Sequence, residues 1–279
     1  MSSVAGTMSG VAVPRLTQRE HLTQARVAVS EWTKFRSLRS TRWSLGVGVL
    51  LTMALPILFS FVTASHWSHM SPSERAGRNP LDIALAGVNI AQLAIAVLGV
   101  LVITGEYSTG MIRSSFIAVP KRLPVLWAKI SVYAAVSFVL MVPSVIVAFF
   151  ASQAVLSGHH ILQISIGSSG VLRSIIGGAL YVTLVGVFAL GIGAMVRNTA
   201  GGIATFAGIF FVIPPLMNIL PTSWNNAVTP YLPSEAGRQL FSLHQSAHSL
   251  SPLWGGLLML GYCAAVVAVA AMLLVRRDA

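Results

Sequence analysis

The sequence predicts an all-α integral membrane protein with six transmembrane helices. Only 9% of its 279 residues are charged, whereas soluble domains carry roughly 25%. Hydrophobic residues make up 55% of the chain, and the mean hydropathy is +0.78. They gather in six runs of about 20 residues, the length of helix that crosses roughly 30 Å of hydrocarbon. A very apolar soluble protein is the alternative, and runs of this length disfavour it.

Each apolar run is expected to be a helix, because backbone polar groups in lipid must be paired within the segment. The six spans are expected at 44–64, 83–104, 125–152, 171–196, 201–220 and 253–275. Residues 1–20 are expected to form a disordered tail, and residues 21–279 a single transmembrane domain. Glycines are frequent in the fourth run, which predicts that this helix packs closely against its neighbours.

An amphipathic helix is predicted over 22–40, directly before the first span. Its apolar residues recur at helical spacing and are Leu22, Ala25, Ala28, Val29, Trp32 and Phe35. Polar residues, among them Glu31 and Lys34, fall on the other face. A helix of this kind lies in the membrane interface, with its basic side chains near anionic lipid headgroups. An ordinary basic anchor beside the membrane is the competing interpretation.

Lysine and arginine are distributed unevenly between the loops, and this predicts the orientation. If the N-terminus is cytoplasmic, 14 of the 18 Lys and Arg residues lie on that side. The other side holds only Arg75, Arg78, Arg173 and Arg238. Both termini are therefore expected in the cytoplasm. The net charge of +11 could also indicate nucleic-acid binding, but the basic residues flank apolar runs, so no nucleic-acid partner is expected.

The sequence contains none of the common motifs for nucleotide binding, zinc proteolysis or serine hydrolysis. It has no G-x-x-x-x-G-K-[ST] phosphate loop, no H-E-x-x-H and no G-x-S-x-G. Six of its seven histidines fall on the predicted outer side, which allows a metal site. Polar loops often carry histidine, however, so no metal-ligand set is predicted. The single cysteine, Cys263, lies in an apolar run and is expected to act as a small hydrophobic residue.

The centres of the spans contain no Asp, Glu, Lys or Arg. Proton- or ion-coupled carriers usually need such a residue inside the bundle, so an ATP-independent carrier is disfavoured. Asn89, Gln92 and Asn218 are the most polar residues deep in the spans. They are candidates for lining a substrate path, and interhelical hydrogen bonding is their alternative role.

The segment GEYSTGMIRSSFIAVPKR (105–122) concentrates charged, aromatic and glycine residues between the second and third runs. One face of a short helix, ended by Pro120, can be lined by Met111, Ile112, Ser115, Phe116 and Val119. Glu106 is expected to hold this loop by pairing with Arg113 or with the amphipathic helix. Phe116 would fit a groove on a cytosolic partner. An ordinary, positively charged inner loop is the alternative.

Two segments resemble the ABC type-2 exporter permeases of bacteria. SEWTKFRSLRSTRW (30–43) is similar to their interfacial connecting helix, to which we assign Glu31, Trp32, Lys34, Arg39 and Trp43. GEYSTGMIRSSFIAVPKRLPVLWAK (105–129) is similar to their G-E-Y/F-x-x-G-T-I-R loop, except that Met111 stands where threonine is commoner. LGIGAMVRNTAGGI (190–203) and YLPSEAG (231–237) are similar to later parts of the family, so the resemblance covers about 30–275.

The resemblance implies the transmembrane subunit of an ATP-driven exporter in a bacterial cell membrane. Two permease copies, identical or paralogous, would each bind a separate cytosolic ATPase subunit. That subunit would hold ATP and Mg²⁺, and no cofactor is expected in this chain. The coupling residues would be Glu106, Tyr107, Gly110, Met111, Ile112, Arg113 and Phe116.

The same resemblance leaves a second function open. Some relatives transmit ATPase motion to an outer-side protein without moving a substrate, and here the contact would be the segment 221–252. The missing phosphate loop fits both functions, because the nucleotide would be bound in another chain. A membrane enzyme is disfavoured, since no catalytic group of residues is visible in the sequence.

Overall fold

The computed structural model describes residues 24–111, 122–159, 161, 163–243 and 248–276, and its regular elements within these ranges are helices. Five long helices are α2 (Arg39–His66), α4 (Pro80–Ser108), α6 (Arg122–Gly158), α7 (Val171–Val196) and α12 (Pro252–Arg276). A composite helix joins α8 (Thr199–Ala207), the π-helical turn η2 (Gly208–Val212) and α9 (Ile213–Met217). The shorter elements are α1 (Gln24–Ser37), η1 (Trp67–His69), α3 (Pro72–Ala76), α10 (Thr222–Val228), η3 (Thr229–Tyr231) and α11 (Pro233–Arg238).

Six of these helices are long and apolar enough to cross a membrane, which confirms the predicted class and number of spans. Several of them extend beyond the predicted apolar runs. α4 begins at Pro80, where proline occupies the first helical turn and the Asn79 side chain accepts a hydrogen bond from the Leu81 N–H at 2.9 Å. The polar residues at such ends continue the helix, because helical hydrogen bonding does not stop where the apolar run stops.

The core of the bundle forms around α7. About 89% of the most apolar stretch of α7 is buried, against 17% for the α8–α9 span, which lies at the periphery. α4, α6 and α12 pack directly on α7. A side chain on Gly99 of α4 would collide with the backbone oxygen of Gly186 in α7. Only glycine fits where these two helices approach so closely, which confirms the close packing predicted for the fourth span.

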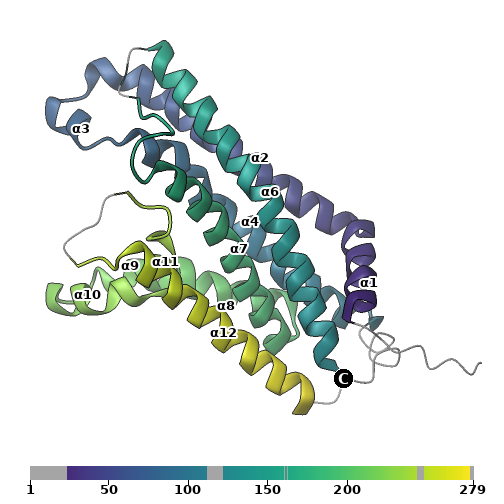
Figure 1. Cartoon of the computed structure of the whole chain (residues 1–279). Coiled ribbons are helices and arrows are strands. Elements are labelled where there is room, and N and C mark those ends of the chain that lie inside the picture. Colours follow the sequence, from purple (N-terminus) through teal and green to yellow (C-terminus); the bar gives the residue numbers. More distant parts are fainter. Residues whose placement is uncertain (1–23, 112–121, 160, 162, 244–247, 277–279) are drawn as a thin grey trace, which may run out of the picture.

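The two ends of the bundle carry different elements (Figure 1). α1 packs on the start of α6 and lies at the end of the bundle where α12 also ends, and we call this the α1 end. α3, α10 and α11 lie toward the opposite end, which we call the α3 end. A break at Leu38, whose backbone is extended, separates α1 from α2 and lets α1 turn against α6.

Candidate functional site

Four charged side chains from three helices form a cluster at the α1 end. Glu31 and Lys34 lie one turn apart on α1, Glu106 lies in the last turn of α4, and Lys129 lies two turns into α6. Lys129 Nζ donates to Glu31 Oε2 at 2.6 Å and to Glu106 Oε1 at 2.9 Å. Lys34 Nζ donates to Glu31 Oε1 at 2.7 Å and to Glu106 Oε1 at 3.2 Å. Each lysine therefore bridges both carboxylates.

Burial makes this charge cluster different from a surface ion pair. The side chains of Lys129, Glu31 and Glu106 are only 4%, 5% and 7% exposed. The side chain of Lys34 is 25% exposed. Two acids and two bases balance in charge, so the formal net charge of the cluster is zero. Removing one partner from a buried pair costs about 3–5 kcal/mol, because the other charge then stays buried without compensation. The cluster therefore holds α1, α4 and α6 together.

The pKa values of Glu31 and Lys34, the two members of the cluster on α1, reflect these contacts. Burial alone would raise the pKa of Glu31, but the charge and hydrogen bond of Lys129, with those of Lys34, lower it below its ordinary value of 4.5. Burial would likewise lower the pKa of Lys34, but the hydrogen bond to Glu31 and the nearby Glu106 carboxylate raise it above 10.5. Both groups are therefore charged across the neutral range.

α1 packs on the bundle through a mixed stripe of residues. Val27, Glu31 and Phe35 are buried at four-residue spacing, whereas Val29 and Trp32 of the predicted apolar face are 64% and 45% exposed. Glu31, which the helical pattern assigned to the polar face, faces inward because Lys129 supplies a buried positive charge there. The amphipathic pattern thus identified the helix but not the face that packs.

The end of α4 also contacts the junction between α7 and α8. The guanidinium carbon of Arg197 lies 5.0 Å from the centre of the Tyr107 ring, within the range of a cation–π interaction. Arg197 ends α7 with a φ of 56°, a left-handed conformation that is uncommon outside glycine. One turn of α4 earlier, Thr199 Oγ1 donates to Thr104 Oγ1 at 2.8 Å. The predicted 105–120 loop therefore begins later than expected, because residues 105–108 continue α4. The end of α4 is tied to α7 through Arg197 and to α8 through Thr199.

The remaining predicted coupling residues lie at the start of that loop or beyond it. Gly110 has a φ of 71°, which allows the chain to leave α4 in a left-handed turn. Met111 is 44% exposed. Ile112, Arg113 and Phe116 lie outside the described residues, as does the short helix predicted there, so these assignments stay predictions.

Three predicted residues of the amphipathic segment lie on its exposed side. Trp43 is 76% exposed, Trp32 is also exposed, and Arg39 is the exposed first residue of α2. None of them joins the charge cluster. The segment therefore combines a buried ionic contact through Glu31 and Lys34 with aromatic and basic side chains on its outer surface.

The three candidates for a substrate path are not gathered in one place. Gln92 is buried and accepts a hydrogen bond from the Tyr181 hydroxyl at 2.5 Å, which joins α4 to α7. Asn89, one turn away, lines a polar pocket of about 290 Å³ with α11 residues. Asn218 follows α9, is exposed, and accepts a hydrogen bond from Asn225 at 3.3 Å. No described hydrogen bond connects Asn218 to the other two.

Lys129 is the site residue that the sequence interpretation left without a role. The sequence around Lys129 indicates that it faces inward. Leu126, three residues before it, and Tyr133, four residues after it, lie on the same helical face and are buried. A lysine on the inward face of a helix needs an acidic partner. Glu31 is 98 residues away in sequence, however, so the partner could not be identified from the pattern of α6.

Metal binding has no support among the described residues, where no three His, Cys, Asp or Glu side chains form a group that could hold an ion. No protein-family model matches the chain, and no curated protein matches it.

Proposed function

We propose that the chain is the permease subunit of an ATP-driven ABC exporter, and that its 105–120 loop receives motion from a separate ATP-binding subunit. The observation that carries this proposal is the charge cluster of Glu31, Lys34, Glu106 and Lys129. It stands where α4 leads into the loop and ties α4 to α1 and α6. The family resemblance of the two segments that contain these residues points to the same function.

A force applied to the loop would reach the helices through this cluster. α4 could not tilt alone, because separating Lys129 from Glu31 and Glu106 leaves buried charges without partners. α1, α4 and α6 would therefore move as one unit. The contacts of Tyr107 with Arg197 and of Thr104 with Thr199 would pass the movement to the start of α8. The α8–α9 span is largely exposed, which suits a helix that moves.

The proposal includes the surroundings and partners of the chain. Both termini would lie in the cytoplasm of a bacterium, with α1 in the interface of the cell membrane, because basic residues concentrate at that end. ATP and Mg²⁺ would be bound by the ATPase subunit. A second permease copy would complete the transport path, and the exposed apolar residues Phe211, Val212 and Leu216 would face that copy or lipid.

Co-purification from the native host tests this function. The tagged chain is extracted in mild detergent, and proteins that accompany it are identified and quantified by mass spectrometry. We expect a chain with a G-x-x-x-x-G-K-[ST] loop in near-equal amount, and we expect it to be lost from Glu106→Gln and Phe116→Ala. The matched control is Glu235→Gln, which breaks an exposed pair with Arg238 at the α3 end. Recovery of the wild-type chain alone, also after crosslinking in cells, contradicts the proposal.

A second function is favoured by exposed aromatic residues at the α3 end. Trp224 of α10 is 65% exposed, and Tyr231 of η3 is 54% exposed. They would provide the contact if the chain transmits ATPase motion to an outer-side protein without transport. Crosslinking from Trp224 to one partner protein, together with no substrate movement in reconstituted vesicles, supports this second function over export.

A further inference from the structure

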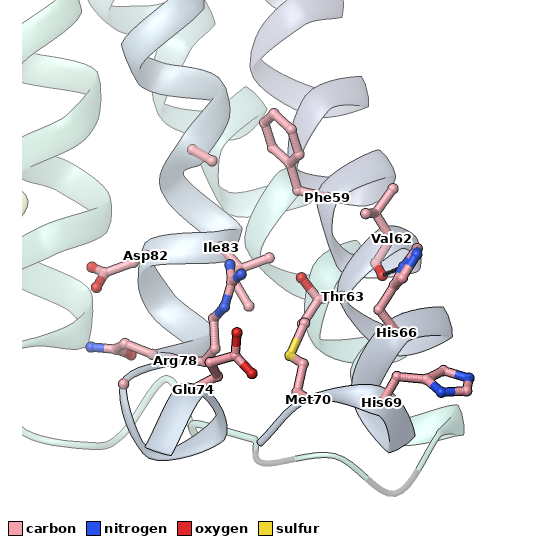
Figure 2. Close-up of a pocket in the computed structure, with 13 residues that line it drawn as sticks. Phe59, Val62, Thr63, His66, His69, Met70, Glu74, Arg78, Asp82 and Ile83 are labelled. Carbon is pink, nitrogen blue, oxygen red and sulfur yellow. Dashed lines mark hydrogen bonds between the residues drawn. The ribbon is translucent and has the colours of Figure 1, made fainter. Parts of the chain in front are cut away.

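A pocket of about 640 Å³ opens at the α3 end between two membrane-spanning helices (Figure 2). The last two turns of α2 form one wall, the first two turns of α4 form another, and the connection through η1 and α3 closes the end. Pockets for small ligands have volumes of roughly 300–1,000 Å³. The pocket is therefore large enough for an organic ligand, and it shares no residue with the charge cluster at the α1 end.

The lining changes from apolar to polar along the helices. Phe59 and Val62 on α2 and Ala86 on α4 lie on the side of the membrane centre, and His66, Glu74 and Arg78 lie nearer the connection. Phe59 and His66 are seven residues apart on one helix, which corresponds to about 10 Å. A ligand that follows this gradient has an apolar chain and a polar headgroup.

Three charged residues line the polar side of the pocket, namely Arg78, Glu74 and Asp82. Figure 2 shows the Arg78 side chain directed toward Ile83, with the Glu74 carboxylate beside it, whereas Asp82 and His69 point away from the middle of the group. The charge of Arg78 helps to lower the pKa of Glu74, but among the described residues the Arg78 side chain makes no hydrogen bond and no ion pair within 4 Å. Its guanidinium can therefore donate two parallel hydrogen bonds to a phosphate group.

Glu74 is held in a fixed position by a capping box at the start of α3. Its Oε2 accepts hydrogen bonds from the Ser71 backbone N–H at 2.7 Å and from the Ser71 hydroxyl at 2.8 Å. These bonds, the backbone bond first, lower the pKa of Glu74. The carboxyl group is therefore ionised at neutral pH, and its Oε1 atom takes part in neither bond.

Arg75 provides a contrast within the same connection. Its guanidinium donates to the Ser68 backbone oxygen at 3.1 Å and lies 5.8 Å from the centre of the Trp67 ring. It does not line the pocket. The two arginines thus have separate roles, because Arg75 stabilises the connection while Arg78 presents its charge to the pocket.

We propose that this pocket binds a zwitterionic phospholipid from the adjacent leaflet. The phosphate would be bound by Arg78, the ammonium group would lie against Glu74, and one acyl chain would follow Phe59, Val62 and Ala86. A phosphate with a neighbouring ammonium group matches one guanidinium with a neighbouring carboxylate, and a chain matches the apolar wall. The lipid site does not depend on the chain being an exporter permease.

Photolabelling tests the lipid site in the full chain reconstituted in nanodiscs. The probe is a phosphatidylethanolamine with a diazirine in its acyl chain, and labelled residues are mapped by peptide mass spectrometry. We expect the label on the α2 segment around Phe59 and Val62. Arg78→Gln should reduce it about tenfold, which corresponds to the loss of one charge-assisted hydrogen-bonded group. Ala86→Phe should abolish it by filling the apolar wall.

Two control variants separate the pocket from general effects on folding or lipid contact. Arg238→Gln removes an exposed arginine at the same end, and Ala135→Phe fills an apolar groove between α1 and α6. Both should label as the wild type does. Labelling that spreads over all exposed helices and is unchanged by Arg78→Gln and Ala86→Phe would overturn the proposal.

Two further labelling measurements identify the ligand. A phosphatidylglycerol probe with the same acyl chain has the phosphate but no ammonium group, and it should label this segment more weakly. Equal labelling by both probes contradicts recognition by Glu74. Inorganic phosphate should not compete with the lipid probe, and full competition would assign the pocket to a free phosphate compound instead of a lipid.

Discussion

Replacing Lys129 by methionine tests the charge cluster most severely. Methionine keeps the volume and apolar stem of the side chain but removes the ammonium group that bridges Glu31 at 2.6 Å and Glu106 at 2.9 Å. Two buried carboxylates would then share Lys34 alone. The expected destabilisation is about 3–5 kcal/mol, the usual cost of removing one partner from a buried ion pair.

The magnitude can be stated as a change in thermal stability. For a chain of this size class, a loss of 1 kcal/mol lowers Tm by about 2–4 °C, so Lys129→Met should lower it by roughly 6–20 °C. The single cysteine makes the assay direct. Cys263 is buried in α12, and a fluorogenic thiol reagent therefore reports its exposure as the bundle unfolds.

A second substitution separates the lost charge balance from lost packing. Glu31→Gln combined with Lys129→Met removes one acid and one base and leaves the pair of Lys34 with Glu106. We expect the double variant to be more stable than Lys129→Met alone. Exposed pairs contribute only about 0–1 kcal/mol, so Glu235→Gln should change Tm little. A Tm of Lys129→Met within about 2 °C of wild type, which corresponds to less than 1 kcal/mol, refutes the structural role of the cluster.

Three other predictions follow from individual contacts. Because the pKa of Glu31 is lowered in the folded state, the ionised carboxylate stabilises the fold above pH 4.5, and this stabilisation is lost as the pH falls through the folded pKa. Tm measured from pH 7 to pH 3 should therefore decline below pH 4.5. A flat profile contradicts the role of Glu31 in the charge cluster. Gly99→Leu should prevent close packing of α4 on α7 and abolish a single monodisperse species in gel filtration, whereas Gly105→Ala, where nothing lies within 4 Å, should not. Gln92→Leu should cost about 1–3 kcal/mol by leaving the Tyr181 hydroxyl without its acceptor, and adding Tyr181→Phe should restore most of that stability; no restoration would indicate a role for Gln92 other than this hydrogen bond.

The apolar runs were sufficient to predict the spans. Burial of an apolar segment in a membrane depends on length and composition, which are properties of the local sequence, and the part of the chain that the structure describes has six helices long and apolar enough to cross one. Helix ends were predicted less well, because residues outside the apolar part can cap or begin a helix, as Asn79 and Pro80 do for α4. The glycines of the fourth span indicated close packing, but not that Gly99 of α4 would be a partner.

The candidate site was predicted only in part, for a physical reason. Glu106 and the residues of α1 stand in recognisable segments, and Glu106 was expected to pair either with Arg113 or with α1. Its contact with Lys34 agrees with the second of these. The role of Lys129 depends on how α1, α4 and α6 meet, and helical spacing within one element contains no information about that. The same holds for the lipid pocket, whose walls come from α2 and α4.

Site-specific crosslinking from Met111 tests the proposed function most directly. Met111 is exposed where α4 leads into the 105–120 loop, and a photoreactive amino acid is introduced there in the otherwise unchanged chain in its native host. The matched control has the same amino acid at Trp224, at the α3 end. We predict that position 111, but not position 224, crosslinks to a protein with a G-x-x-x-x-G-K-[ST] phosphate loop. Crosslinks from position 111 to lipid alone, or equal capture of that protein from both positions, would contradict the proposed coupling to an ATP-binding subunit.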